Sequence, residues 1–433
     1  MKLALIGPDM TGHLNPMSTL GGALQRAGHE VSLCGIAPSK RWADRAGLGF
    51  IEFGREEHAS GLIETGREKL GRLQGLKAMR WTTYLLQQAA DIVLRDAPPA
   101  LQAAGIEGVI ADQVTPGGSS VAEVLGLPCA IVCNALAFHL EPSLPPAVLP
   151  WPYRTGLLAR MRNRFGNAVL VQATTKILKT VNRFRTHHGL IPIPKGVLVH
   201  EELIQVAQQP EFLDFPRLTL PSHFHYTGPW HHSDRDSDVP FPWDRLDGRP
   251  LVYASLGTLQ NRLDQLFRNI IDACSTLDVQ LVLSLGRPEG QLAGPVPSGT
   301  IVVPYAPQLA LLDRASAVIT HGGLNTSLET LARGLPMVAL PMTNDQPGVA
   351  RRLEWLGVAR VVLPTQATVS RLRTALRDVL EDQNLRKAAE HRSEDLRQSP
   401  DVDTAAALIT HAFKTRQRVH RSDAGLPVQS GGA

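Results

Sequence analysis

The sequence is poor in cysteine, and this scarcity argues against a metal site built on thiolates. The 433 residues contain four cysteines, and none of their spacings is typical of a metal site. Cys129 and Cys133 flank an apolar run that is typical of a strand, with no hairpin to close a site around a metal ion. We therefore predict buried free thiols in the reducing cytoplasm and no bound metal, for Cys34, Cys129, Cys133 and Cys274.

Long apolar runs and a large net charge are lacking as well. No segment approaches the roughly 18 consecutive apolar residues of a transmembrane helix. The apolar N-terminus, Lys2 to Gly7, is interrupted by Pro8 and is too short for a secretion signal, so it predicts a first β-strand. A formal net charge of +4, with 19% charged residues, does not imply a nucleic-acid partner.

Acidic residues are missing from one long segment. Between Pro142 and His200 there is no Asp or Glu, whereas the same segment carries nine arginines and lysines. Apolar and aromatic side chains are interleaved with the first of these basic residues. The segment 151–185 therefore suits peripheral contact with an anionic membrane surface, and a solvated face of the N-terminal domain is the alternative. The basic residues are Arg154, Arg160, Arg162, Arg164, Lys176, Lys179, Arg183, Arg185 and Lys195.

Alternation of short apolar runs with helical periodicity predicts an α/β fold. Residues 2–6 read as a strand, 7–16 as a turn rich in glycine and proline, and 17–27 as an amphipathic helix. Further strands are predicted at 50–53, 108–111 and 129–133, and residues 62–96 read as mainly helical. This rhythm is typical of a doubly wound parallel sheet.

The same rhythm restarts after a polar, proline-rich stretch, which predicts two domains. Residues 251–254, 279–285 and 300–303 read as strands, with a helix at 263–277. Two Rossmann-like, doubly wound halves should therefore face each other across a ligand cleft. We predict an N-terminal domain at 1–230, a linker at 231–250, a C-terminal domain at 251–416 and a disordered tail at 417–433.

The stretch from Ala317 to Gln346 predicts a phosphate site. It reads as strand, glycine turn, helix and strand, with His321-Gly322-Gly323 as the turn. Unpaired backbone N–H groups at such a helix start lie at the positive end of the helix dipole, where they favour phosphate. His321, Asn325 and Glu329 are spaced four apart and fall along one stripe of the helix. An ordinary strand–helix turn without a ligand is the alternative.

A histidine and an aspartate are predicted at the corresponding edge of the N-terminal sheet. His13 follows the first strand, and Asp112 follows the strand at 108–111. An imidazole at this position suits a general base at neutral pH, and a carboxylate that accepts its hydrogen bond fixes the tautomer. A structural or merely exposed loop histidine is the alternative.

Residues 305–346 complete a pattern that resembles the donor-binding motif of UDP-dependent glycosyltransferases with the GT-B fold. The tract HGGLNTSLETL, followed by DQPGVARRL, is its most specific part, and the similarity is closest to bacterial zeaxanthin glucosyltransferases. It extends to residues 108–150, 215–229 and 254–260. Gly322 and Leu324 stand where plant members carry Cys and Trp, which weakens inference from those enzymes about the donor sugar.

The resemblance implies a role for each matching position. His13 would be the catalytic base, oriented by Asp112. Tyr305 and the Ala306 backbone would hold uracil, Glu329 the ribose, and Asp345 with Gln346 the sugar hydroxyls. The diphosphate would be held by Ser255, Thr258, His321 and backbone N–H groups around Gly323, Asn325 and Thr326. The wall of the acceptor pocket is assigned to Met10, Trp81, Phe138 and His139.

The resulting expectation is a cytoplasmic, inverting and metal-independent hexosyltransferase that uses UDP-glucose as co-substrate and needs no cofactor. Its acceptor would be lipophilic, with a carotenoid such as zeaxanthin as the first candidate, and it would have no nucleic-acid partner. Three alternatives stay open: transfer to a macrolide, flavonoid or other small aglycone, non-catalytic binding of a nucleotide sugar, and epimerisation of a sugar nucleotide.

Overall fold

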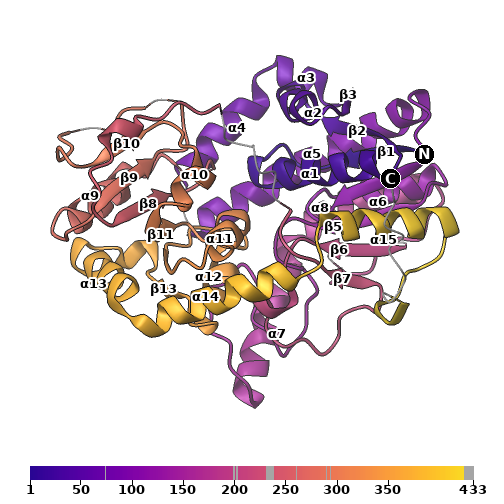
Figure 1. Ribbon diagram of the computed structural model, residues 1–433. Coiled ribbons are helices and arrows are strands. Elements are labelled where there is room, and N and C mark those ends of the chain that lie inside the picture. Colours follow the sequence, from indigo (N-terminus) through magenta and orange to yellow (C-terminus); the bar gives the residue numbers. More distant parts are fainter. Residues whose placement is uncertain are drawn as a thin grey trace, which may run out of the picture.

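The computed structural model folds into two α/β halves, each built on one parallel sheet (Figure 1). It describes residues 1–73, 75–197, 200, 203–230, 238–259, 261–288, 290–292 and 294–423. All strand pairs in both sheets run parallel, and α-helices lie between most consecutive strands. The predicted pair of doubly wound domains is confirmed.

The N-terminal sheet has seven strands in the order β3-β2-β1-β4-β5-β6-β7. Each of the segments predicted at 50–53, 108–111 and 129–133 lies within one residue of an observed strand at both ends. The strands are β1 (Lys2–Ile6), β2 (Glu30–Gly35), β3 (Gly49–Glu52), β4 (Gly108–Asp112), β5 (Cys129–Cys133), β6 (Ile204–Ala207) and β7 (Phe224–Tyr226).

The C-terminal sheet has six strands in the order β10-β9-β8-β11-β12-β13. They are β8 (Leu251–Ser255), β9 (Gln280–Ser284), β10 (Ile301–Val303), β11 (Ala315–Thr320), β12 (Met337–Ala339) and β13 (Ala359–Val361). In each sheet the strand order reverses beside one central pair, β1 with β4 and β8 with β11. Ligands of open parallel sheets bind at the carboxyl ends of strands at such a reversal.

Fifteen α-helices lie among the described residues. Those before the second sheet are α1 (Thr11–Arg26), α2 (Lys40–Ala46), α3 (Arg55–Ala59), α4 (Leu62–Gly71), α5 (Gly75–Ala103), α6 (Gly118–Val124), α7 (Leu157–Ala173) and α8 (Thr175–His187). The later ones are α9 (Asp264–Cys274), α10 (Gln308–Leu312), α11 (Leu324–Leu331), α12 (Gln346–Trp355), α13 (Val369–Glu381), α14 (Gln383–Gln398) and α15 (Val402–Thr415).

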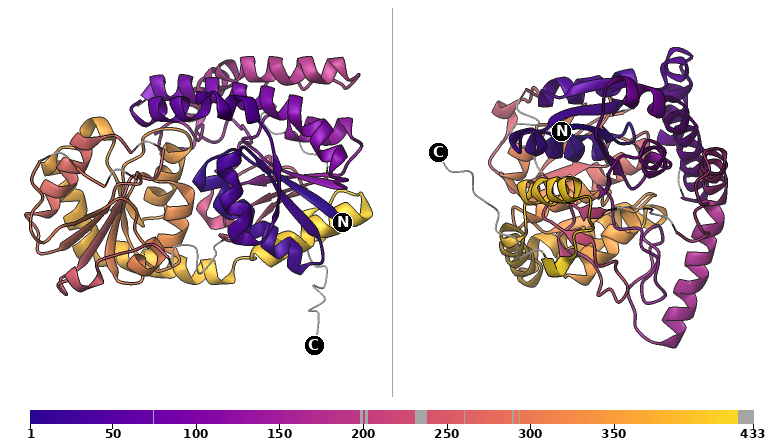
Figure 2. Two further views of the ribbon diagram at one scale, coloured as in Figure 1. Left: turned by 90° about the horizontal axis from the view of Figure 1, so that it is seen from above. Right: turned by 90° about the vertical axis from the view of Figure 1, so that its right-hand side faces the viewer.

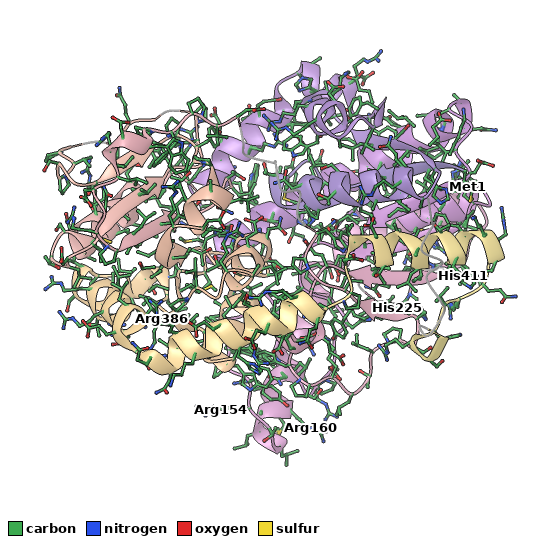
Figure 3. The ribbon with its side chains drawn as sticks, viewed as in Figure 1. Met1, Arg154, Arg160, His225, Arg386 and His411 are labelled. Carbon is green, nitrogen blue, oxygen red and sulfur yellow. The ribbon has the colours of Figure 1, made fainter. Side chains whose placement is uncertain are left out.

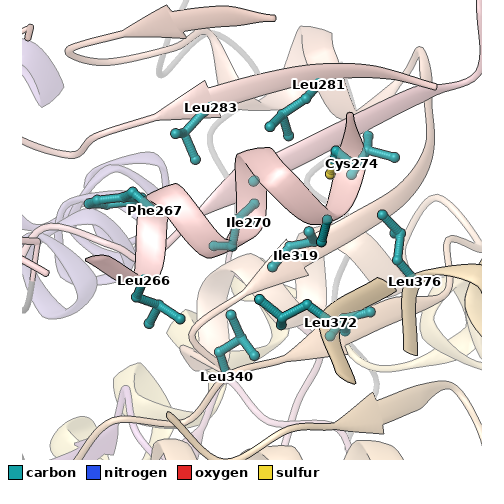
Figure 4. Packing of buried hydrophobic residues seen from close by; sticks show 14 of the residues in the cluster. Leu266, Phe267, Ile270, Cys274, Leu281, Leu283, Ile319, Leu340, Leu372 and Leu376 are labelled. Atoms are coloured by element: carbon teal, nitrogen blue, oxygen red, sulfur yellow. The ribbon is translucent and has the colours of Figure 1, made fainter. Parts of the chain in front are cut away.

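Close packing of helices on the sheet fixes the C-terminal half. Phe267, Ile270 and Cys274 of α9 recur at helical spacing and face Leu281 and Leu283 of β9 (Figure 4). These side chains are at most 2% exposed, so the face of α9 that carries them is fully desolvated. Burial of one such large apolar side chain contributes about 1.5–3 kcal/mol, which makes this half a rigid support for the turns at its edge.

The end of the chain returns to the N-terminal half (Figure 2). Helix α15 lies within the range 251–416 that the sequence assigned to the C-terminal domain. Its buried residues, among them Ile409 and Phe413, nevertheless pack with Leu3 and Leu20 of the N-terminal sheet and α1. The chain therefore crosses between the two halves twice, at the predicted linker and again before α15.

The predicted disordered tail begins too early. Val419 is 2% exposed and belongs to the N-terminal core, and its carbonyl oxygen lies 2.8 Å from His225 Nε2. Arg421 donates to the Phe224 carbonyl oxygen on β7. Although the stretch has low hydropathy, one buried apolar side chain and several polar contacts hold residues 419–421 against the N-terminal half. Residues 424–433, and 231–237 of the predicted linker, lie outside the described residues.

Helix α1 begins six residues earlier than predicted, at Thr11. Residues 7–16 read as a turn partly because of Pro16. Proline lacks the N–H that would bond the carbonyl oxygen four residues back in a helix. That carbonyl, on Gly12, instead accepts a hydrogen bond of 2.9 Å from Asn325 Nδ2 in the C-terminal half. A contact between the two halves thus replaces the missing helical bond, and His13 lies in the first turn of a helix rather than in a loop.

Candidate active site

One cavity of about 550 Å³ lies where the reversal points of the two sheets meet. In the N-terminal sheet β1 pairs with β4, so His13 and Asp112 follow neighbouring strands. In the C-terminal sheet Thr320 pairs with Ser255, which brings the turn at His321 beside the end of β8. His13 and Asp112 line the cavity from one half, and Ser255, His321 and Asp345, which lies at the start of α12, line it from the other.

His13 and Asp112 form the predicted pair. His13 Nδ1 lies 2.8 Å from Asp112 Oδ2, and Asp112 is buried while the His13 side chain is 14% exposed. An ionised carboxylate only accepts hydrogen bonds, so Nδ1 carries the proton and the Nε2 lone pair remains for a substrate. Asp112 also accepts from the Asn134 side-chain amide at 2.6 Å and from the Val114 N–H at 2.8 Å, which hold its carboxylate in place.

Burial and charge act in opposite directions on the pKa of His13. Burial lowers it, whereas the charge and hydrogen bond of Asp112, and the charge of Asp345, raise it. The net effect raises the pKa of His13 above its ordinary value of 6.5. The imidazolium form is therefore stabilised, which suits a group that receives a proton during a reaction.

Asp345 brings the C-terminal half into contact with the N-terminal half. Its Oδ2 accepts a hydrogen bond of 3.1 Å from the Leu136 N–H. Burial raises the pKa of Asp345, while that hydrogen bond and the nearby His13 oppose the rise. Gln346 also lines the cavity, and its Oε1 accepts from the N–H groups of Met342 and Thr343. Among the described residues no acceptor is bonded to the Gln346 amide nitrogen, which can therefore donate to a ligand.

The glycine turn and the start of α11 have the geometry expected of an anion site. The first N–H groups of α11 face the cavity wall at Gly323, Asn325 and Thr326, and no described side chain caps this helix end. His321 is wedged between Gly323 and Gly257, where an added Cβ on Gly257 would lie 2.7 Å from His321 Nε2. Only glycine admits the imidazole this close to the backbone.

His321 is neutral at physiological pH. Burial lowers its pKa to about 4, against a smaller opposing effect of the Ser255 backbone. Its Nδ1 is buried without a hydrogen-bond partner among the described residues. A buried nitrogen of this kind is costly unless a ligand or water bonds it. Ser255 and Thr258 line the same part of the cavity, so the predicted diphosphate group of residues is brought together.

The predicted nucleoside end has an exposed ring and a buried acid. Tyr305 is 45% exposed and lines the cavity beside Ala306, which is buried. Glu329 is fully buried and does not line the cavity. Gln308 links Glu329 to the cavity. Its side-chain amide donates to Glu329 Oε2, and Gln308 itself lines the cavity. The sequence motif contains Gln308, although its role was not predicted.

Two polar residues that were not predicted as site residues, Gln208 and Asn134, connect the halves around the site. Gln208 Nε2 donates to Asn325 Oδ1 at 2.8 Å and to the Asn134 carbonyl oxygen at 3.1 Å. Asn134 in turn donates to Asp112. The base, its acid and the start of α11 are thus joined by one chain of hydrogen bonds. Asn134 directly follows β5, so the strand-end argument that identified Asp112 applies equally to it.

The structure separates the four residues assigned to the acceptor pocket. Met10 and Phe138 line the cavity. Trp81 faces α4 instead, where its Nε1 donates to the Gly66 carbonyl oxygen at 2.9 Å, and the neighbouring Thr82 and Thr83 of α5 take the cavity side. His139 Nε2 lies 2.6 Å from Gln205 Oε1, and His139 does not line the cavity. Both therefore serve packing.

A buried ionic cluster joins the halves behind the cavity. Asp214 accepts from Arg352 of α12 at 2.7 Å, from Tyr226 at 2.8 Å and from Arg217 at 2.5 Å. The Arg352 guanidinium also lies 4.3 Å from the centre of the Phe215 ring. Despite its burial, the pKa of Asp214 is well below its usual range because of the two arginines. The sequence offered no sign of this cluster.

Other expectations concern thiols, metal and membrane. All four cysteines are free and buried, as predicted. The described residues contain no group of three or more His, Cys, Asp or Glu side chains placed to hold a metal ion. No helix among them is long and apolar enough to cross a bilayer.

Comparison with known proteins matches the chain to one family. The family model of the UDP-glucoronosyl and UDP-glucosyl transferases matches residues 72–400. A zeaxanthin glucosyltransferase of Pantoea ananas is 32% identical over 360 residues, which are 82% of this chain and 83% of the relative. A zeaxanthin glucosyltransferase of Pseudescherichia vulneris is 30% identical over 427 residues, 96% and 99% of the two chains. The crystal structure of the glycotransferase of kitacinnamycin, a GT-B protein, superposes with a TM-score of 0.75 at 21% identity, covering 95% of this chain and 99% of that one.

Proposed function

The chain belongs to the UDP-glucoronosyl and UDP-glucosyl transferase family, and we propose that it moves glucose from UDP-glucose to a hydroxyl of a lipophilic acceptor. A carotenoid such as zeaxanthin is the first candidate. The observation that carries the proposal is the His13–Asp112 pair, which shares one cavity with the uncapped start of α11. A base and an anion site on opposite sides of one cavity are what group transfer from a nucleotide sugar needs.

The proposed reaction is a single inverting displacement. The acceptor oxygen attacks the anomeric carbon of glucose, and its proton passes to His13 Nε2. The bond from that carbon to the UDP oxygen breaks, and the electron pair leaves with UDP. Asp112 stabilises the imidazolium that forms, as the raised pKa of His13 supports. General base catalysis of this kind contributes roughly 10²–10⁴-fold to the rate.

The departing diphosphate would be stabilised by fixed dipoles. The start of α11 and the His321 side chain line the same part of the cavity. A preorganised donor is worth about 3 kcal/mol where charge develops in the transition state. Asp345 and the Gln346 amide would hold sugar hydroxyls, with Asp345 kept in place by the Leu136 N–H. We assign no metal or cofactor to this chemistry.

A lipophilic acceptor is supported by the far end of the cavity. Beyond His13 its wall is mostly apolar and comes from β5, from α5, α7 and α8, and from the segments that follow β5 and α8. A mostly apolar wall with few polar groups favours a hydrophobic ligand whose reacting hydroxyl lies at the polar end. The apolar residues of this wall include Met79, Leu86, Ile131, Phe138, Leu170, Val171, Ile177, Leu178, Val181, Ile193 and Val197.

The direct test is product analysis. The purified chain is incubated with UDP-glucose and zeaxanthin dispersed in detergent, and the products are separated and analysed by mass spectrometry. We expect a hexose adduct of the carotenoid and release of UDP. Macrolide and flavonoid acceptors run in parallel decide the acceptor class. Adducts with those acceptors alone would refute the carotenoid assignment, and UDP-glucose binding without any adduct would leave a non-catalytic binding protein.

Glu329→Ala tests the nucleoside end of the site. We expect a donor KM raised about 5- to 10-fold, with kcat reduced less, because Gln308 loses the carboxylate that orients it toward the ribose. Steady-state kinetics with varied UDP-glucose would measure the effect. Asp313→Ala is the control, since Asp313 contacts Arg333 on the exposed surface. An unchanged donor KM in Glu329→Ala would remove Glu329 from the donor site.

A further inference from the structure

Helix α7 presents an unpartnered apolar face to solvent. Leu158 is 82% exposed and Phe165 is 69% exposed. At about 100° per residue, the exposed apolar side chains of α7 cover an arc of roughly 120° on one side of the helix. The members of this arc are Leu157, Leu158, Met161, Phe165 and Val169, here called the α7 face.

The opposite side of α7 is fixed to the body of the protein. Ala159, Asn163 and Gly166 are buried there, and Asn163 Nδ2 donates to the Pro142 carbonyl oxygen. Gly166 packs so closely on Trp151 that a Cβ on it would lie 2.6 Å from that ring. The helix is therefore held with its apolar face outward, and Trp151 serves this packing rather than the exposed surface.

Positive charge borders the α7 face. Arg160 and Arg164 are exposed along one border of the arc, and Arg154 precedes the helix. Figure 3 shows Arg154 and Arg160 at the outer end of α7, away from both sheets. No acidic residue occurs between Pro142 and His200 to offset them. On α8, Lys176, Lys179 and Arg183 recur at helical spacing and are also exposed.

We infer that the α7 face docks on an anionic phospholipid membrane, with its apolar side chains among the acyl chains and its arginines at the lipid phosphates. An apolar arc bordered by cationic side chains is the arrangement of helices that lie in a bilayer interface. Self-association through this face fits less well. A two-fold contact would bring the arginines of both copies together, with no acidic residue of the segment to pair with them.

The inference rests on the proposed lipophilic acceptor and explains how it would reach the base. Leu170, Val171 and Thr174, at and just after the last turn of α7, line the cavity that contains His13. At about 1.5 Å per residue, Leu157 and Leu170 are roughly 20 Å apart along the helix. The N-terminal end of α7 would therefore contact the membrane, while its C-terminal end lines the acceptor cavity. This arrangement places the cavity close to the lipid in which the acceptor dissolves.

Vesicle sedimentation of the full chain tests the docking without any substrate. We expect binding to vesicles of phosphatidylcholine mixed with phosphatidylglycerol, little binding to phosphatidylcholine alone, and loss of binding at high salt. Leu158→Glu and Phe165→Glu should each weaken binding at least tenfold. Leu218→Glu is the matched control, because Leu218 is 71% exposed and lies outside α7. It should bind as the wild type does.

The same samples are examined by sedimentation equilibrium for mass and by calorimetry for UDP binding. A monomeric wild type that ignores anionic vesicles would refute the docking. A dimer broken by Leu158→Glu, without vesicle binding, would assign the face to a second copy of the chain. Since the assay contains neither UDP-glucose nor acceptor, its outcome is independent of the product analysis. Retained UDP binding shows that the variants are folded.

Discussion

His13→Ala is expected to lower kcat for glucosyl transfer by about 10²–10⁴-fold while UDP binds as tightly as in the wild type. The reason is geometric. His13 stands on the N-terminal side of the cavity, whereas the start of α11, His321 and Tyr305 stand on the C-terminal side. Removing the imidazole takes away the proton acceptor and leaves the anion site intact. Steady-state kinetics and titration calorimetry with UDP would measure the two quantities.

The pH dependence separates a base from a merely structural histidine. A base must be neutral, so kcat/KM should fall tenfold per pH unit below its pKa. Because the pKa of His13 is raised, this fall should begin above pH 6.5. Asp112→Asn removes the charge that raises this pKa, so the fall should move to lower pH and the rate at neutral pH should drop.

His411→Ala is the control for His13→Ala, since His411 is exposed on α15, outside the cavity (Figure 3). It should keep wild-type kinetics. Transfer by His13→Ala at the wild-type rate would contradict the assignment of the base. Loss of UDP binding in the same variant would mean that His13 supports the structure of the site rather than its chemistry.

The sequence predicted those strands and site residues that depend on a short local pattern. Apolar runs of a few residues located the strands, and a polar residue directly after such a run located Asp112. The glycine turn and the spacing of Asn325 and Glu329 located the start of α11. Parallel strands end at a common edge, so local order along the chain predicts a shared place in space. The His13–Asp112 contact follows once β1 and β4 are neighbours.

Long-range contacts account for what the sequence did not predict. Helix α1 starts at Thr11, and Asn325 of the other half bonds the Gly12 carbonyl oxygen that Pro16 leaves without a helical partner. Neighbouring residues of one helix also face different directions. On α5, Thr82 and Thr83 line the cavity, whereas Trp81 bonds α4. A single sequence records neither the partner of a polar side chain nor which residues at the border of a helix face, such as Trp81 on α5, turn toward a cavity. Asp214 and Arg352, 138 positions apart, are the clearest case.

The Asp214 cluster should govern both stability and the alignment of the two halves. Asp214→Ala leaves the buried guanidinium groups of Arg352 and Arg217 without their carboxylate, and breaking a buried pair in this way costs about 3–5 kcal/mol. We expect the free energy of unfolding, measured by urea denaturation, to fall by about that amount. Arg360→Ala, which breaks partly exposed contacts with Asp378 and Asp382, should cost at most about 1 kcal/mol.

A double variant separates two contributions to the free energy of unfolding: the cost of a buried charge left without its partner, and the stabilisation by the Asp214–Arg352 ion pair itself. Asp214→Leu with Arg352→Met removes the stranded charge of Arg352 but leaves Arg217, which keeps Glu141 at 3.7 Å, so it should recover part of the stability that Asp214→Ala loses. Its kinetics are the more informative measurement. Arg352 lies two turns after Asp345 on α12, and Asp345 bonds the Leu136 N–H across the cavity. If the cluster aligns the halves, the stable double variant should still show a reduced kcat. Wild-type kcat in that variant would limit the cluster to a role in stability.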